Sequence, residues 1–453
     1  MKINPSIFKA YDIRGTYPEE INEEAAYKIG AAFVKLLGKR FPPKIVIGRD
    51  CRLSSPSLFE ALSRGIRDQG ANVVNIGVVS TPMLYFSVIY FGAEGGIEIT
   101  ASHNSGEQNG FKIVREAAKP VSGVSGLEEI KKLAENIGKT KPRGRTYKRD
   151  IEDKYLKNIS PLINREKIDE FKIVIDAGNG VGSLIISELF KKLPVQFFPL
   201  YFDLDGSFPH HLPNPLAKDN LIDIKKEIKK RQADLGIIFD GDADRVVFLT
   251  EKGEAVSGDL ITALLSSSLL AQSPGAKILY DIRSSRAVKE EIEKNGGVPV
   301  VSRIGHSFIK EKMRQEKIIF GGELSGHYYF QSCGYIESPL VAAGKVLEVL
   351  SQEKKSLSQA IKPLQRYFSS GEINFNVGKK KEVMKSIAEN YKKTAQNISW
   401  LDGLTVEFSD YWFNLRPSNT ENLLRLNLEA DNKKIKEEKV KEISKLITDP
   451  SFL

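Results

Sequence analysis

The sequence predicts an α/β protein: three similar α/β domains with mixed sheets, followed by a smaller C-terminal α+β domain. The first observation is a repeated apolar segment of strand length, which begins with lysine and leads within three residues to an aspartate. It occurs at Lys44–Ile47, Lys172–Ile175 and Lys277–Tyr280. The second observation is that these segments lack clean polar–apolar alternation and are separated by helical stretches. Both features are typical of buried α/β sheets.

A second strand is expected later in each repeat, at Gly96–Ile99, Leu235–Phe239 and Lys317–Phe320. Each of these strands ends in a polar loop of unusual composition. Ligands of α/β sheets bind beyond the carboxyl ends of the strands. Each of the three domains is therefore expected to contribute one loop to a site.

One helix between the strands is easy to place. Ser55 supplies a cap and Pro56 suits the first helical position. Apolar residues then recur at four-residue spacing, and Gly70 ends the run: Leu58, Leu62 and Ile66.

The pattern changes near the C-terminus, where Phe368–Gly371 is expected to be a linker. Three leucines then alternate with polar residues, as in a half-buried strand of an antiparallel sheet: Leu424, Leu426 and Leu428. The expected domains are residues 1–148, 149–252, 253–367 and 371–453.

Composition excludes several classes of protein. Of the 453 residues, 41% are hydrophobic and 28% charged, as in ordinary globular proteins. Neither a membrane span nor a secretory signal is expected, and two cysteines, Cys51 and Cys333, imply no disulfide framework. A cytoplasmic location is expected. The net charge of +9 comes from lysine-rich stretches interrupted by acids, which favours a small anionic substrate over nucleic acid.

The loop after Phe239 predicts a metal site. Asp240, Asp242 and Asp244 alternate at the end of a strand, where hard divalent cations find carboxylate ligands. A plain surface turn does not require three alternating aspartates. An EF-hand is excluded because Arg245 stands where that loop needs glycine. The arginine also suggests that the metal's other ligand is anionic.

The loop after Ile99 predicts a nucleophile. Ser102 is accompanied by His103, Asn104 and Lys112, which handle protons and bind anions. A serine at this boundary is often only a helix cap. A Ser-His hydrolase fits poorly, since adjacent residues rarely form a nucleophile–base pair and no Gly-x-Ser-x-Gly elbow is present. A serine that carries a phosphoryl group fits better.

Two further loops predict recognition of sugar and phosphate. Glu323, Ser325 and His327 lie in a glycine-rich loop and can bind vicinal hydroxyl groups, although a polar turn would look similar. The loop at 416–421 combines arginine with small polar residues, as phosphate cradles do. The segment 303–307 could add anion contacts, whereas His210 and His211 fit a rigid structural loop.

Together with the segment Phe8–Gly15, these four loops occur in an order that resembles the α-D-phosphohexomutase superfamily, in particular bacterial phosphomannomutase/phosphoglucomutase. The resemblance covers essentially the whole chain. It implies three similar α/β domains and a smaller fourth, with an active cleft between the four.

The resemblance also implies a mechanism. Ser102 would be a phosphoserine with a phosphate oxygen on one Mg²⁺ per chain, and Asp240, Asp242 and Asp244 would be the other protein ligands. Phosphoserine would convert a hexose phosphate into a bisphosphorylated hexose, which turns in the cleft and returns its other phosphate to Ser102. The phosphosugar is the expected partner, and a monomer or weak homodimer is expected.

Further roles follow from the same resemblance. Lys112 and Arg14 would stabilise the transfer, and His327 would be the general base with His306 nearby. Glu323 and Ser325 would bind the sugar hydroxyls, and Arg245 would hold the sugar as it turns. The remaining expected substrate contacts are Tyr11, His103, Arg283, Arg303, Arg416, Ser418, Asn419 and Thr420.

The chain departs from the family pattern in a few places. Ser105 and Asn422 replace prolines, Arg283 stands where lysine is common, and Glu337–Pro339 lacks the expected acidic-Gly pattern. The lost prolines should loosen a loop without removing a functional group, and Arg283 keeps the charge but changes its shape. The Glu337–Pro339 departure concerns the choice of sugar rather than the reaction. Leu324 and Asn419 favour phosphomannomutase/phosphoglucomutase over phosphoglucosamine mutase. Phosphoglucosamine mutase, a phosphosugar- or metal-binding protein without turnover, and a phosphatase remain the alternatives.

Overall fold

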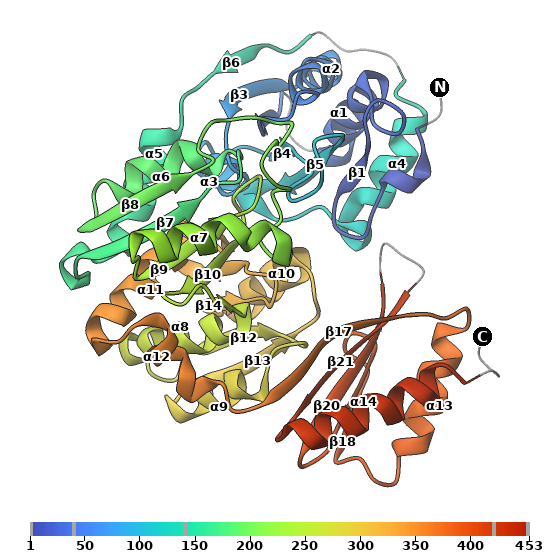
Figure 1. Ribbon diagram of the computed structural model, residues 1–453. Helices are drawn as coiled ribbons and strands as arrows, with labels where there is room; N and C mark the ends of the chain where they lie inside the picture. Colours follow the sequence, from blue (N-terminus) through green and yellow to red (C-terminus); the bar gives the residue numbers. More distant parts are fainter. Residues whose placement is uncertain (1–2, 39–41, 139–142, 419–422, 450–453) are drawn as a thin grey trace.

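A computed structural model describes residues 3–38, 42–138, 143–418 and 423–449. The described residues form four β-sheets in succession along the chain, and we refer to the units around them as domains I to IV (Figure 1). None of the helices in these ranges is long and apolar enough to cross a bilayer.

Domain I contains a sheet of strand order β1-β5-β4-β2-β3-β6. Its strands are β1 (Ile13–Thr16), β2 (Lys44–Arg49), β3 (Asn72–Val78), β4 (Gly95–Ile99), β5 (Gln108–Arg115) and β6 (Thr146–Lys148). Its helices are α1 (Glu23–Leu37), α2 (Ser55–Asp68), α3 (Thr81–Tyr90) and α4 (Glu128–Glu135). The helix predicted after Ser55 is confirmed, but Ser55 does not cap it: its Oγ donates to Asp50 Oδ1 at 2.7 Å.

Domain II contains a sheet of order β11-β10-β9-β7-β8. Its strands are β7 (Phe171–Asp176), β8 (Val195–Leu200), β9 (Leu235–Phe239), β10 (Val246–Thr250) and β11 (Ala255–Val256). Its helices are α5 (Glu152–Ile159), α6 (Gly182–Phe190) and α7 (Ile222–Arg231).

Domain III contains a sheet of order β13-β12-β14-β15-β16. Its strands are β12 (Lys277–Asp281), β13 (Val298–Ser302), β14 (Phe320–Gly322), β15 (Tyr328–Phe330) and β16 (Ile336–Glu337). Its helices are α8 (Gly258–Gln272), α9 (Arg286–Lys294), α10 (His306–Glu316), α11 (Pro339–Glu353) and α12 (Leu357–Ile361).

Domain IV contains an antiparallel sheet of order β17-β21-β20-β19-β18. Its strands are β17 (Phe368–Asn376), β18 (Asn397–Ser399), β19 (Leu404–Glu407), β20 (Tyr411–Pro417) and β21 (Leu423–Ala430). Its helices, α13 (Lys380–Tyr391) and α14 (Lys433–Ile447), cover one face of this sheet (Figure 1).

The three α/β sheets share one arrangement. The orders β3-β2-β4-β5, β8-β7-β9-β10 and β13-β12-β14-β15 are equivalent: three parallel strands, then an antiparallel fourth. In each case a hairpin joins the third parallel strand to the antiparallel one. The predicted fold class, with three related mixed sheets and a fourth unit, is confirmed.

Two predicted segments are wrong in detail. The apolar Ile318 and Ile319 do not begin a strand, because Lys317 is left-handed and Ile318 N–H closes the end of α10 on Met313. The strand starts at Phe320 instead. Phe368–Gly371 is not a linker but the start of β17, where a bulge accommodates Gly371 at φ +66°.

Candidate active site

The three hairpins that join β4 to β5, β9 to β10 and β14 to β15 carry the predicted Ser102, Asp240 and Glu323 loops. They meet at the carboxyl ends of the parallel strands. Ser102 Oγ lies 2.9 Å from Asp240 Oδ2, and His327 Nε2 lies 3.3 Å from Asp244 Oδ1. Loops from domains I, II and III therefore form one site.

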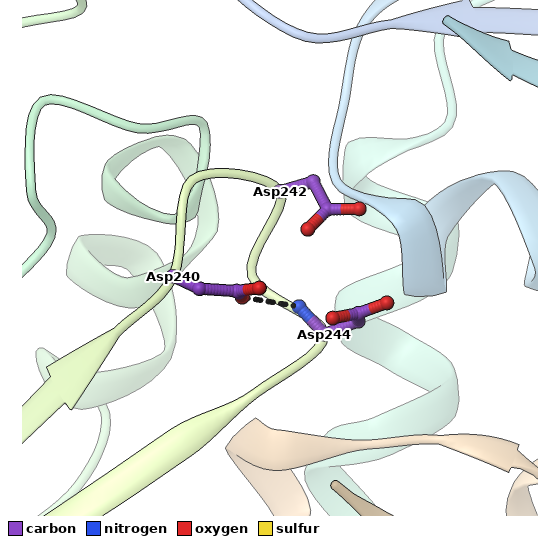
Figure 2. A group of neighbouring side chains, drawn as sticks. All are labelled: Asp240, Asp242 and Asp244. Atoms are coloured by element: carbon purple, nitrogen blue, oxygen red, sulfur yellow. Dashed lines mark hydrogen bonds between the residues drawn. The ribbon is translucent and has the colours of Figure 1, made fainter. Parts of the chain in front are cut away.

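The Asp240 loop brings three buried carboxylates together, each offering an oxygen within 4.8 Å of the others (Figure 2). Asp240 Oδ1 accepts the backbone N–H groups of Asp244 and Arg245, at 3.1 and 3.0 Å, which fixes the turn. Oδ1 of Asp242 is buried and has no hydrogen-bond partner among the described residues, whereas Oδ1 of Asp244 is buried and faces His327 Nε2. These oxygens fit a hard divalent cation such as Mg²⁺.

Lys112 offsets part of this negative charge. Its Nζ lies 2.5 Å from Asp242 Oδ2 and also contacts Asp244 Oδ2. Burial acts to lower the pKa of Lys112, but the Asp242 and Asp244 carboxylates raise it above its usual value. Burial and the neighbouring Asp244 and Asp242 raise the pKa of Asp240 well above its usual range. Burial acts to raise the pKa of Asp244, but Lys112 and His327 hold it well below that range.

Ser102 is fully buried and has a left-handed backbone with φ +53°. Its N–H donates to Thr100 Oγ1 at 2.9 Å, and its Oγ donates to Asp240 Oδ2. His103 Nδ1 lies 3.3 Å from the same Oγ. The positive charge of Arg245 and burial hold the pKa of His103 well below its usual value, so His103 is neutral at pH 7.

Arg52 was not identified from the sequence, although it organises the Ser102 loop. It is completely buried, and its Nε donates to Asp50 Oδ2 at 2.9 Å. Its terminal nitrogens donate to backbone carbonyls of the loop, namely those of Ser102, Asn104, Ser105 and Gln108. A signal existed: Asp50-Cys51-Arg52 and Asp281-Ile282-Arg283 occupy equivalent positions after the first strand of their repeats.

Two more groups lie close to these loops: Thr81, which was not identified from the sequence, and the predicted Arg14. Thr81, at the start of α3, donates to Asp242 Oδ2 at 2.5 Å and ties domain I to the metal loop. The predicted Arg14 donates to Asp12 Oδ2 at 2.7 Å and to Ala101 O at 3.2 Å, so it lies beside the Ser102 loop.

The Glu323 loop lies against the Asp240 loop. Ser325 Oγ lies 2.9 Å from His327 Nδ1, and Arg245 Nε donates to His327 Nε2 at 3.2 Å. The Glu323 carboxylate is buried and accepts a hydrogen bond from Tyr329. The structure thus brings together the predicted Arg245, Glu323, Ser325 and His327.

His306 is the first residue of α10. Its Nδ1 lies 3.7 Å from Glu337 Oε1, and burial together with Lys310 holds the pKa of His306 well below its usual value. The Tyr11 ring packs edge-on against His306, and Tyr11 Oη donates to Ile304 O at 3.0 Å. Arg303 is exposed and stacks on Phe308, with its guanidinium 4.3 Å from the ring centre.

Arg283 belongs to domain III and Arg416 to β20 of domain IV. Arg283 pairs with both oxygens of Asp281, at 3.1 and 2.9 Å. Arg416 is buried, and its terminal nitrogen lies 3.5 Å from Glu372. Ser418 N–H donates to Leu423 O at 2.8 Å. Asn419, Thr420 and Asn422 lie outside the described residues.

Comparison with known proteins agrees with this geometry. Four family models match in succession, described as phosphoglucomutase/phosphomannomutase domains I, II and III and the C-terminal domain. They cover residues 5–141, 153–253, 257–367 and 372–446.

Relatives match over almost their whole length. A phosphomannomutase of Vibrio cholerae is 41% identical over 452 residues, which are 97% of this chain and 98% of that protein. A phosphomannomutase of Escherichia coli is 39% identical over 434 residues, which are 93% of this chain and 94% of that protein.

A solved structure of a phosphoglucomutase/phosphomannomutase family protein from Burkholderia thailandensis is 31% identical, with a TM-score of 0.91. That match covers 99% of this chain and 98% of the solved one. The chain therefore belongs to the phosphoglucomutase/phosphomannomutase family of phosphohexose mutases, which are isomerases.

Proposed function

We propose that this enzyme interconverts hexose 1-phosphate and hexose 6-phosphate, of mannose or glucose, through a phosphoserine at Ser102 and a bisphosphorylated hexose. The observation that carries the proposal is the 2.9 Å contact of Ser102 Oγ with Asp240, at the edge of the buried carboxylate triad. A serine in this position can hold a phosphoryl group next to its metal.

The chain's own groups account for the proposed chemistry. Asp240, Asp242 and Asp244 would hold Mg²⁺, which when bound offsets negative charge on the transferring phosphoryl group. Lys112 and Arg14 lie on the same side and add positive charge there. The Ser102 Oγ–phosphorus bond breaks as a sugar hydroxyl oxygen attacks, and His327 Nε2 accepts the hydroxyl proton.

The second half of the cycle runs in reverse on the other end of the sugar. The bisphosphorylated hexose turns in the cleft, its other phosphoryl group returns to Ser102 Oγ, and the proton returns from His327 to the released hydroxyl. Glu323 and Ser325 bind the sugar hydroxyls, while Arg416 and Ser418 hold the phosphate that does not transfer. Tyr11, His103, Arg245, Arg283 and Arg303 are proposed as further contacts, with His306 beside the proton-handling groups.

Replacing the nucleophile tests this proposal. Ser102→Ala should lower mutase kcat by about 10⁴-fold or more, because the phosphoryl carrier is lost, while hexose 1-phosphate still binds in calorimetry. Ser105→Ala, in the same loop, is the control and should keep most activity. Mutase activity of Ser102→Ala within tenfold of wild type would refute the phosphoserine mechanism.

Rates on three substrates test which sugar phosphate the enzyme prefers. Mannose 1-phosphate, glucose 1-phosphate and glucosamine 1-phosphate should be compared with Mg²⁺ and a hexose bisphosphate present. We expect turnover of mannose or glucose phosphate. A preference for glucosamine 1-phosphate would instead identify a phosphoglucosamine mutase, and sustained release of inorganic phosphate a phosphatase.

A further inference from the structure

Two arginines lie directly opposite each other in the domain IV sheet. Arg416 on β20 and Arg425 on β21 are paired residues of an antiparallel ladder. Their neighbours Leu415, Leu424 and Leu426 are buried in the domain IV core, so both guanidinium groups leave the face of the sheet away from α13 and α14. Like charges directly opposite destabilise a sheet unless an anion lies between them.

A carboxylate on a neighbouring strand lies close to both guanidinium groups. Glu372, on the neighbouring strand β17, lies 3.5 Å from an Arg416 nitrogen and 3.2 Å from an Arg425 nitrogen. It thus bridges the two guanidinium groups. Its own side chain is 30% exposed, whereas that of Arg416 is 6% exposed.

The bridge does not give every nitrogen of Arg416 a hydrogen-bond partner. Its Nε is buried and has no hydrogen-bond partner among the described residues. Burial and the positive charge of Arg283 lower the pKa of Arg416. A phosphate dianion carries more negative charge than a carboxylate and offers more oxygens to the free Nε of Arg416.

We propose that Glu372 is an internal competitor of the substrate's non-transferring phosphate, and that Arg425 is a further residue that binds this phosphate. The inference rests on the proposed function, because it assumes that Arg416 binds that phosphate. The phosphate takes the place of the Glu372 carboxylate between Arg416 and Arg425.

The Glu372 carboxylate has room to move away from Arg416 and Arg425. A cavity of about 770 Å³ between domains II, III and IV is lined by Glu372 together with Arg283 and Leu324 of the sugar-binding side. The β-bulge between Ser369 and Glu372 lets this part of β17 depart from regular pairing.

This arrangement would give selectivity by charge. A ligand must compete with the Glu372 carboxylate, which already contacts both arginines. A neutral or singly charged group therefore gains little binding free energy by replacing it. A phosphate dianion gains a second charge and additional hydrogen bonds. Glu372 thus makes binding weaker in absolute terms and more selective for phosphate.

Inorganic phosphate is the probe, titrated by calorimetry into Mg²⁺-free enzyme with unphosphorylated Ser102. Glu372→Gln keeps the shape of the side chain and removes the competitor, so phosphate should bind about tenfold more tightly. Arg425→Gln should weaken phosphate binding by about tenfold. The control is Glu389→Gln, which removes an exposed pair with Lys392 on α13 and should change nothing.

Thermal stability adds a readout that a purely structural role would not give. Without phosphate, Glu372→Gln should melt below wild type, because Arg416 and Arg425 repel each other. Saturating phosphate should restore its melting temperature to that of wild type. If Glu372→Gln does not fold without anion, the Arg425→Gln titration decides alone.

Unchanged or weaker phosphate binding by Glu372→Gln would overturn the competitor role. Unchanged binding by Arg425→Gln would overturn the assignment of Arg425. These results are independent of turnover: failure of the mutase assay with the phosphate shifts intact would refute the proposed function and leave the phosphate site standing.

Discussion

Glu98 is a buried acid whose strand neighbour is Lys112 of the site. It lies on β4 between Gly48 of β2 and Lys112 of β5, which are its paired residues on the two neighbouring strands. Its side chain covers Gly48, where an added Cβ would lie 2.3 Å from Oε2. Neither carboxylate oxygen has a hydrogen-bond partner among the described residues. Burial and the negative charges of Asp50 and Asp242 raise the pKa of Glu98 well above its ordinary 4.5.

The raised pKa predicts a pH-dependent stability difference between wild type and Glu98→Gln. Below pH 4.5 Glu98 is protonated in both folded and unfolded chains, so its burial as a charge does not lower the free energy of unfolding. Above that pH only the unfolded chain ionises freely, and wild type loses about 1.4 kcal/mol of unfolding free energy per pH unit until the folded pKa is reached. Glu98→Gln avoids this loss.

Melting temperatures from pH 4 to 8 check the prediction. The variant should match wild type near pH 4 and become the more stable of the two as pH rises. Because all other titrating groups are shared, the difference isolates Glu98. Parallel curves would show that Glu98 ionises normally in the folded protein.

At the scale of elements, the loops that follow the strands and carry the site could be predicted from the sequence. The residues that hold these loops in place could not. The loops of Ser102, Asp240 and Glu323 combine a strand signal with residue types that serve chemistry. Arg52 carries no such signal alone, because its role is to bind backbone carbonyls that come close only in the folded chain. Ile318 and Ile319 were wrongly predicted to lie in a strand, because apolar residues occur at the end of a helix as well as in strands.

The first strand of each α/β repeat ends in the same turn. Asp50, Asp176 and Asp281 each accept, through Oδ1, the backbone N–H two residues ahead, at 3.0, 2.8 and 2.8 Å. The sequence revealed the three aspartates as a repeat. It did not reveal the hydrogen bond, which stabilises the turn from which Arg52 and Arg283 extend.

The backbone of the Asp240 loop lies close to that of the Ser102 loop, and this predicts the effect of Gly241→Ala. An added Cβ at Gly241 would lie 2.6 Å from Ser102 O, and a carbonyl cannot move aside as a flexible side chain can. The two loops must separate. A displacement of about 1 Å should lower kcat about 100-fold, and Mg²⁺ should bind more weakly.

Steady-state kinetics and Mg²⁺ titration measure these effects. Gly378→Ala is a suitable control, because its added Cβ would meet nothing within 4 Å. Wild-type kcat in Gly241→Ala would mean that the contact between the two loops does not position Ser102.

At the scale of the whole molecule, one cluster of buried residues runs through domains I to III, in addition to a cluster within domain I alone, and within the described part of the chain the core of domain IV joins neither. One continuous cluster of buried residues contains Val46, Ile173 and Ile278, from the sheets of domains I, II and III. The core of domain IV is a separate cluster among the described residues. Domain IV joins domain III through polar contacts, such as that of Arg286 N–H with Glu429 at 2.9 Å. The two parts are therefore expected to unfold separately.

A buried ion pair at the contact between domains I and III allows a test of whether domain IV unfolds separately from domains I to III. Lys310 of α10 lies 2.9 and 3.0 Å from the two oxygens of Glu337, both side chains are fully buried, and Lys310 Nζ lies 4.1 Å from the Tyr85 ring centre of domain I. Lys310→Met leaves the Glu337 charge buried and unpaired, which should cost about 3–5 kcal/mol. Adding Glu337→Leu should restore most of that loss.

Two optical probes separate the two parts of the molecule. Both tryptophans, Trp400 and Trp412, belong to domain IV, so their fluorescence follows that domain, whereas far-ultraviolet circular dichroism follows the whole chain. In Lys310→Met the main circular dichroism midpoint should fall while the tryptophan midpoint stays within error of wild type. If both midpoints fall together, the four domains unfold as one unit. If neither falls, the Lys310–Glu337 pair does not hold domain III against domain I.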